Sequence, residues 1–335
     1  MDADVYLNGN VCQRREFSSE EEFEEFVEDN SKELFGESSV FLEMKKQISS
    51  RTLGGTVPDG FLFDLSDVDN PQFYLVEVEL QKHGFYSHIF PQITKFFSSI
   101  NRPENENKIV EQIYSYLKEN PEKKRRFKEL IGDKEIYKTI KDAVVNSEDI
   151  LVILDEKKEE ITEVNEIYTD TWDKMVKTMV VSVFNQNNDR LITVEPKFEK
   201  LGLVDITGEE KKEGYDEEYH LEGKEESTKE IYNTLKEKVL SYNNNLEFNP
   251  QKYYISIRDK KNFAYIKLRK TKIQIVVMLP IHLGEEIIQN YKVKESSQSV
   301  KDYYNGECFR VTVDNKENLN EVLNALKKAH NHSIN

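Results

Sequence analysis

The chain of 335 residues carries 47 Lys and Arg against 63 Asp and Glu, a net charge of −16, and 37 % of it is hydrophobic. This length suits two domains, and the hydrophobic fraction can build a core, which excludes a wholly disordered chain. Two cysteines exclude a four-cysteine zinc site, and no secretory signal or membrane-spanning run is visible, so we expect a cytoplasmic protein away from membranes. The average charge also argues against a nucleic-acid partner.

The charge is distributed unevenly along the chain. Residues 1–80 hold 6 basic and 19 acidic side chains, a balance of −13, whereas residues 251–280 hold 8 basic and one acidic side chain, a balance of +7. The acidic, polar stretch 207–225 lacks apolar periodicity and is typical of a linker. We therefore expect a first domain over residues 1–206 and a second domain over residues 226–335.

Apolar spacing and capping residues predict the elements of the first domain in chain order. We expect a helix over 18–36, followed by three strands over 40–46, 56–65 and 72–80. A second helix is expected over 85–100, further helices over 106–146 and a fourth strand over 149–156. A helix over 166–179, with Met175 and Met179 on its apolar side, and a hairpin over 180–196 follow. This order favours an α/β fold with a mixed sheet flanked by helices.

The second domain reads as a smaller α+β domain. It opens with a helix over 227–242 and closes with one over 317–330, and four strands lie between them, over 252–258, 263–268, 272–279 and 308–313. The tight turn between the second and third of these strands favours an antiparallel sheet.

Acidic side chains on the second and third strands of the first domain form a candidate metal site. Glu77 and Glu79 share one face of a strand because side chains alternate, and Asp59 lies on the strand before it. Neighbouring carboxylates repel each other unless a hard cation such as Mg²⁺ neutralises them. The alternative is that both glutamates lie on a solvated face of the sheet.

The order of four short segments resembles that of the PD-(D/E)XK nuclease superfamily. These segments are FEEFV (23–27), PDG (58–60), VEVEL (76–80) and PQITKF (91–96). The resemblance covers residues 18–155 and implies a restriction-endonuclease-like core. It also implies a metal site with Asp59 and Glu77 as ligands and Glu79 as a further ligand. Glu79 occupies the position at which most members carry lysine, so the lysine that orients water is left unassigned.

Further site residues follow from the same resemblance. It implies that Glu24 of the first helix completes the acidic cluster, with Glu20 as the alternative. Either Lys82 or Lys95 would replace the missing lysine, and Gln92 with Phe96 is similar to a helix signature of some members. His88 lies four residues before Gln92, and we expect it to be structural. Plain helix solvation is the alternative for Glu24 and Gln92.

Two basic segments are candidates for contact with nucleic acid. Aromatic residues alternate with cations over 251–280, which suits stacking on bases and neutralising phosphates; the alternative is a hairpin whose lysines prevent edge pairing. The cations expected to contact nucleic acid are Lys267, Arg269, Lys270, Lys272, Lys124 and Arg125. The segment from 252 to the terminal helix also resembles an uncharacterised domain found fused to nuclease-like domains.

Together these patterns predict a Mg²⁺-dependent nuclease, with Mn²⁺ as a substitute, that hydrolyses phosphodiester bonds by metal-activated water. DNA is the expected substrate, and a homodimer would suit cutting both strands. The alternative is an inactive nuclease-fold protein that binds nucleic acid or another protein.

Overall fold

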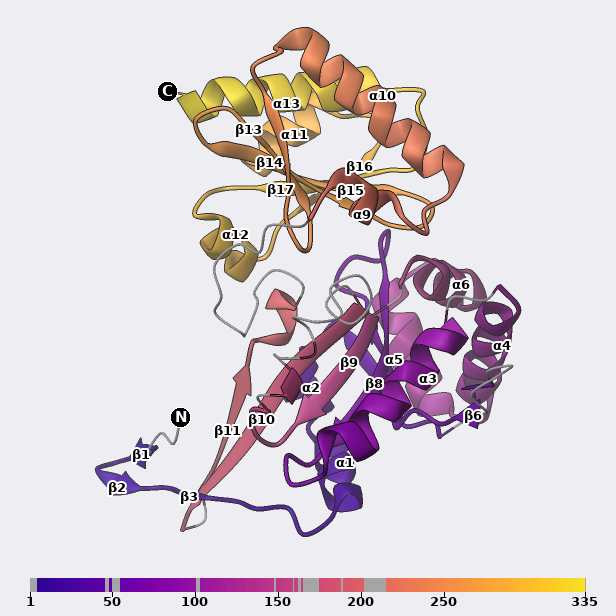
Figure 1. The fold of residues 1–335 in the computed structure, drawn as a ribbon, viewed down its shortest axis with the longest axis vertical. Coiled ribbons are helices and arrows are strands. Elements are labelled where there is room, and N and C mark those ends of the chain that lie inside the picture. The colour runs from indigo at the N-terminus through magenta and orange to yellow at the C-terminus, as the bar shows by residue number, and fades with distance from the viewer. Residues whose placement is uncertain are drawn as a thin grey trace. The chain divides into compact units, whose positions relative to one another are not determined.

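The protein is described by a computed structural model over residues 5–45, 48–49, 55–100, 103–147, 149–158, 160–161, 164, 175–187, 189–201 and 215–334. The chain divides into two compact units (Figure 1). Unit 1 comprises residues 1–144 and 148–208, and unit 2 comprises residues 145–147 and 209–335.

Unit 1 is built on a seven-stranded sheet in the order β11-β10-β9-β8-β7-β4, with β3 beside β10. Strands β8, β9 and β10 are parallel neighbours, and the other pairs are antiparallel, so the sheet is mixed as predicted. The strands are β3 Gln13–Arg14, β4 Ser39–Leu42, β7 Gly60–Asp64, β8 Gln72–Glu79, β9 Asp149–Leu154, β10 Val176–Gln186 and β11 Asp189–Glu195. Two small ribbons pair β1 Tyr6–Leu7 with β2 Asn10–Val11, and β5 Ile48–Ser49 with β6 Gly55–Thr56.

The first predicted helix is two helices, α1 Glu20–Asp29 and α2 Ser31–Phe35. The Ser19 side chain caps α1 by accepting a hydrogen bond from the Glu22 amide. The break falls at Asn30, whose side-chain amide donates to the Phe26 carbonyl at 2.7 Å and competes with the helical backbone. The later helices of unit 1 are η1 Phe85–Ile89 (a π-helical turn), α3 Phe90–Ile100, α4 Pro103–Glu119, α5 Pro121–Ile131, α6 Ile136–Asn146 and η2 Phe198–Lys200.

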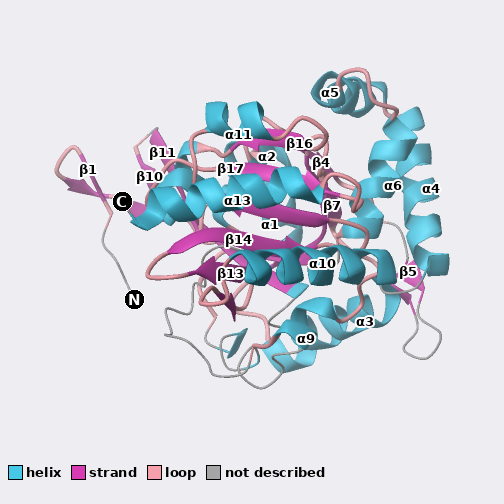
Figure 2. Ribbon diagram, turned by 90° about the horizontal axis from the view of Figure 1, so that it is seen from above, coloured by secondary structure: helices cyan, strands magenta, loops and turns pink. Residues whose placement is uncertain are grey.

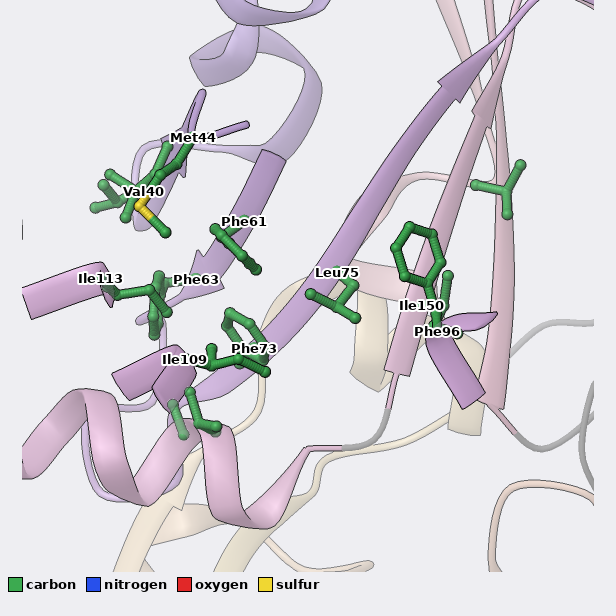
Figure 3. Close-up of a cluster of buried hydrophobic side chains, with 14 of the residues drawn as sticks. Val40, Met44, Phe61, Phe63, Phe73, Leu75, Phe96, Ile109, Ile113 and Ile150 are labelled. Atoms are coloured by element: carbon green, nitrogen blue, oxygen red, sulfur yellow. The ribbon is translucent and has the colours of Figure 1, made fainter. Parts of the chain in front are cut away.

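Helices cover both faces of this sheet, and each face has its own apolar core. On one face, side chains of η1 and α3 to α6 pack against alternate residues of β4, β7, β8 and β9. Figure 3 shows part of this core, with Phe61, Phe73 and Ile150 on the strands and Phe96 and Ile109 on the helices. On the other face, α1 and α2 pack against the residues in between, including Val76 and Val78. Strands β4, β7, β8 and β9 are therefore buried on both sides, which explains their continuous apolar runs.

The predicted helix over 166–179 is wrong at its end. Residues 165–174 lie outside the described residues, but β10 begins at Val176, and Met179 is a buried strand residue. The segment joins the sheet because Val176, Met179, Val181 and Val183 can each be buried on one of its two covered faces. The predicted hairpin is confirmed as the antiparallel pair β10 and β11.

Unit 2 contains a six-stranded, wholly antiparallel sheet in the order β12-β13-β14-β15-β17-β16. Its strands are β12 Glu247–Pro250, β13 Ile255–Arg258, β14 Asn262–Leu268, β15 Ile273–Val277, β16 Lys292–Glu295 and β17 Phe309–Val313. Helices α10 Glu226–Tyr242 and α13 Leu319–Ile334 run side by side over the sheet (Figure 2). The predicted α+β arrangement is confirmed, and β12, β16, α11 Ile281–Ile287 and α12 Gln298–Tyr304 add to it.

Helix α9, Glu217–Leu221, lies within the stretch that the sequence assigns to the linker, and its Tyr219 and His220 are buried. An acidic composition therefore does not prevent this part of the stretch from packing. None of the helices in the described part of the chain is long and apolar enough to cross a membrane.

Candidate metal centre

Pairing of β7 with β8 brings Asp59 beside the Glu77–Glu79 segment. Gly60 pairs with Val76, and the Asp59 amide donates to the Val76 carbonyl at 3.1 Å. The Val78 amide donates to Asp59 Oδ2 at 2.8 Å, which fixes the carboxylate against the strand. Glycine at position 60 is required by space, because a Cβ atom there would lie 2.5 Å from the Phe41 ring.

Glu77 and Glu79 are both completely buried, so the alternative of a solvated face is wrong. They lie on the face of β8 that carries Phe73 and Leu75. Neither carboxylate oxygen of Glu77 has a hydrogen-bond partner among the described residues. Desolvation, reinforced by the negative charges of Asp59 and Glu79, holds the pKa of Glu77 well above its usual range. A buried carboxylate in this state is costly unless a proton or a cation neutralises it.

Helix α1 adds two more carboxylates to the cluster. Oxygens of Glu20, Glu24 and Asp59 all lie within 4.8 Å of one another, and Lys45 Nζ lies 2.5 Å from Glu24 Oε2. Burial raises the pKa of Asp59 to about 8, and the charges of Glu24 and Glu20 act in the same direction. The hydrogen bond from Val78 and the Lys45 ammonium oppose this increase. The structure thus brings Asp59 together with both α1 glutamates that the sequence singled out. Glu77 is not among the acids of the described residues whose oxygens lie within 4.8 Å of one another, but the charges of Asp59, Glu20 and Glu24 act on it.

On its other side, the cluster includes two histidines. His83 Nδ1 lies 2.9 Å from Glu79 Oε2, and His88 Nε2 lies 2.9 Å from Glu79 Oε1. Glu20 Oε2 is 3.3 Å from the His83 nitrogen and 3.8 Å from the His88 nitrogen. Desolvation raises the pKa of Glu79 to about 7; the charge of Glu20 adds to the shift, whereas His88 and Lys158 oppose it.

The two lysines proposed to replace the missing one have different surroundings. The ammonium of Lys82 donates to the carbonyls of Phe17 and Ser18 at 3.2 and 3.3 Å, so it is engaged by backbone. Lys95 is half-buried on α3. Gln92, on the same helix, has a buried Oε1 atom without a hydrogen-bond partner in the described part of the chain.

Sequence reasoning missed His83, Lys45 and Lys158. His83 follows Glu79 by four residues, a spacing that signals proximity only once the turn after β8 is known. The Lys158 ammonium donates to the carbonyls of Gln81 and His83 and so holds this turn. Lys45 follows an edge strand, and no local pattern links it to Glu24.

The basic residues proposed to contact nucleic acid differ in exposure. Arg269 and Lys272, at the turn between β14 and β15, are only 6 % and 5 % exposed, and Lys267 and Lys270 are half-buried. Because a phosphate needs an accessible cation, Arg269 and Lys272 give this interface little support. On α5, Lys124 is exposed, and the Arg125 side chain is 74 % exposed with Glu129 at 3.8 Å.

Comparisons with known proteins match only part of the chain. A family described as "Domain of unknown function (DUF5655)" matches residues 217–333, which run from α9 to α13. An "Uncharacterized protein" of Haemophilus influenzae is 24 % identical over 115 residues, which cover 34 % of this chain and 37 % of that protein. This chain therefore spans little more than a third of that relative's length. No solved structure matches the chain. The family match agrees with the uncharacterised domain expected from residue 252 to the terminal helix.

Proposed function

We propose that the protein is a divalent-metal-dependent nuclease that hydrolyses phosphodiester bonds in DNA, with unit 1 as a PD-(D/E)XK-type catalytic domain. The observation that carries this proposal is Glu77. Its carboxylate is fully buried, lies among other carboxylates and has no hydrogen-bond partner in the described chain. A buried carboxylate without a partner does not stabilise the folded state, so its presence favours a ligand that the carboxylates bind together.

The donor set fits a hard cation. Asp59 and the buried Glu77, on which the charge of Asp59 acts, would be the principal ligands, and Glu79 would be a further one. Glu20 and Glu24, whose oxygens lie within 4.8 Å of each other and of an Asp59 oxygen, would be outer members of the cluster. Carboxylate oxygens are the donors that Mg²⁺ prefers, and Mn²⁺ accepts the same set. When bound in a nuclease site, such a cation polarises the phosphodiester, lowers the pKa of water and stabilises the departing oxygen.

The surrounding residues have separable roles in this proposal. The Val78 amide orients Asp59 through its 2.8 Å hydrogen bond, and Gly60 lets β7 pass close to Phe41. Lys45, whose side chain is 49 % exposed, lies beside Glu24, and its charge acts on Asp59. We therefore assign to Lys45 the cationic role that a lysine at position 79 would have in the superfamily.

The proposal is tested by metal-dependent cleavage. Linear, nicked and branched DNA are incubated with the full chain in Mg²⁺ or Mn²⁺, and product is compared with that of Asp59→Ala. Glu25→Ala is the matched control, because Glu25 is an acid on α1 next to Glu24 and does not belong to the cluster. We expect Asp59→Ala to lose at least about 1,000-fold in rate, since losing several kcal/mol of transition-state stabilisation corresponds to that factor.

A second candidate function is favoured by Glu79 itself. A glutamate where the superfamily carries lysine is compatible with a nuclease fold that binds nucleic acid without cutting it. This candidate predicts DNA binding by the wild type and by Asp59→Ala, with no cleavage in either metal. Cleavage that depends on Asp59 excludes it, and the absence of any cleavage excludes the enzyme.

A further inference from the structure

The two histidines beside Glu79 are not used by the proposed nuclease site. His83 comes from the turn after β8, His88 from the π-helical turn η1, and Glu20 from the start of α1. These elements are separate along the chain, yet one nitrogen of each ring and one oxygen of each acid lie within 4.8 Å of one another. The two imidazole rings meet edge to face, with centroids 5.6 Å apart.

The spacing of these four atoms resembles the ligand shell of a small transition-metal ion. Zn²⁺ binds nitrogen and carboxylate oxygen at about 2.0–2.2 Å in a tetrahedron, which sets ligand atoms about 3.3–3.6 Å apart. The histidine nitrogens lie 3.3 and 3.8 Å from Glu20 Oε2, and each lies 2.9 Å from one of the two Glu79 oxygens, His83 Nδ1 from Oε2 and His88 Nε2 from Oε1, so the distances bracket that range. Shifts of a few tenths of an ångström in the side chains would make all four contacts suitable.

Buried carboxylates provide an independent indication that this place needs a cation. Glu79 is completely buried, and its Oε1 has no well-oriented hydrogen-bond donor in the described chain, although His88 Nε2 is close. Two residues earlier on the same face of β8, the Glu77 carboxylate is also buried and has no hydrogen-bond partner in the described chain, and the charges of Glu79 and Glu20 act on it. The ammonium of Lys158, which is also near, is directed to the carbonyls of Gln81 and His83.

We propose that Glu20, Glu79, His83 and His88 form a binding site for a transition-metal ion of the Zn²⁺ or Co²⁺ class, distinct in ligand chemistry from the all-carboxylate site of Asp59 and Glu77. Imidazole nitrogen suits these ions, whereas Mg²⁺ prefers oxygen ligands and retains its waters. The ion ties the end of β8, its following turn and η1 to helix α1. The two sites share Glu20, which lies in both clusters, and Glu79, which the proposed nuclease site takes as a further ligand. This binding does not depend on DNA cleavage.

The experiment is a Co²⁺ titration of the untagged full chain, followed by the visible absorption of four-coordinate Co²⁺. The assay is run with a large excess of Mg²⁺, which occupies oxygen-only sites. We expect one equivalent of Co²⁺ to bind the wild type and Zn²⁺ to displace it. His83→Ala and His88→Ala should each weaken Co²⁺ binding by about 100-fold or more, since even outer partners of a metal site are worth 10- to 100-fold.

Two control variants distinguish this site from a surface histidine and from the all-carboxylate site. His282→Ala removes a histidine from α11, in unit 2, and should leave Co²⁺ binding unchanged. Asp59→Asn should abolish the proposed nuclease activity while one equivalent of Co²⁺ still binds. Circular dichroism verifies that each histidine variant is folded.

Three results would overturn the inference. They are a wild type that binds no Co²⁺, histidine variants that both bind it as well as the wild type, and displacement of Co²⁺ by Mg²⁺ at similar concentration. Absence of DNA cleavage with Co²⁺ binding intact would refute only the nuclease proposal.

Discussion

Two carboxylates, Glu321 of unit 2 and Glu77 of unit 1, have opposite surroundings. In unit 2, Glu321 accepts hydrogen bonds from the amides of Gln289 and Asn290 and from the Asn290 side chain. Its desolvation is outweighed by these bonds, and its pKa is lowered. In unit 1, Glu77 accepts none from the described residues, and its pKa is raised. Glu321 is a structural acceptor, as Glu22 of unit 1 also is, whereas Glu77 belongs to a group of buried acids in unit 1 whose charge the described residues do not balance.

The same contrast appears around a buried tyrosine. The Tyr232 hydroxyl donates to Glu217 Oε2 at 2.7 Å, and the Lys236 ammonium lies 2.5 Å from Glu217 Oε1. Each oxygen of Glu217 therefore has a donor, and the arrangement requires no ligand. In the acidic cluster of unit 1, Lys45 pairs with Glu24, but Glu77 has no donor among the residues that the structure describes. A structural role therefore explains why Glu217 is present, but it does not explain why the buried Glu77 is.

The largest effect on stability is expected at Glu77. Replacing the unpartnered carboxylate with a neutral amide, Glu77→Gln, should raise the free energy of unfolding of the metal-free protein at pH 8 by about 1–3 kcal/mol. The same change should remove most of the stabilisation by Mg²⁺, because the principal ligand is lost. Urea denaturation with and without Mg²⁺ measures both effects. A loss of stability in the metal-free variant would mean that Glu77 has a structural partner.

A smaller effect is expected from pH. The raised pKa values of Asp59, about 8, and Glu79, about 7, mean that the folded, metal-free protein holds protons more tightly than the unfolded chain. The stability contributed by this difference is complete below about pH 4 and is lost as pH rises to about 8. The melting temperature of the metal-free protein should therefore fall between about pH 5 and pH 8, and stabilisation by Mg²⁺ should increase over that range.

A variant with Asp59→Asn, Glu77→Gln and Glu79→Gln provides the control for the pH experiment. Its melting temperature should vary less with pH than that of the wild type, because the shifted carboxyl groups are absent. Equal pH dependence in the two proteins would assign the effect to other groups.

The smallest effect is expected in unit 2. Tyr232→Phe removes one hydrogen bond to Glu217 but leaves Lys236 beside it, so it should lower the free energy of unfolding by about 0.5–1.5 kcal/mol. This loss should be the same with and without Mg²⁺. A loss that Mg²⁺ reverses would remove the distinction between the two units.

The sequence predicts most of the fold because its signals are local. Alternation in β8 and the run of apolar residues in β9 identify their strands, and the two serines before Glu20 indicate the start of α1. Burial of both faces of the sheet made the segment before Met179 ambiguous, since an apolar run suits a buried strand as well as a helix. The strands β12 and β16 were missed because they are short and polar edge strands.

The sequence predicts the parts of the candidate site that depend on side-chain alternation within a strand or on the pairing of strands that follow each other in the chain. Period-two alternation placed Glu77 and Glu79 on one face, and the pairing of β7 with β8 brought Asp59 to them. Contacts such as Lys45 with Glu24, or His88 with Glu79, depend on the path of loops and on a π-helical turn. No spacing rule in the sequence specifies these contacts.

The central claim is that the buried carboxylates of unit 1 bind a divalent cation. The most direct test is a crystal structure of the full chain grown with Mn²⁺, with an anomalous difference map calculated from data collected at a wavelength where manganese scatters anomalously. We predict a peak within bonding distance of the Asp59 and Glu77 carboxylates. The crystals are grown at about pH 8, where Asp59 begins to ionise. The account would be contradicted if the cluster is ordered, no peak is present, and Glu77 is still buried and unpartnered.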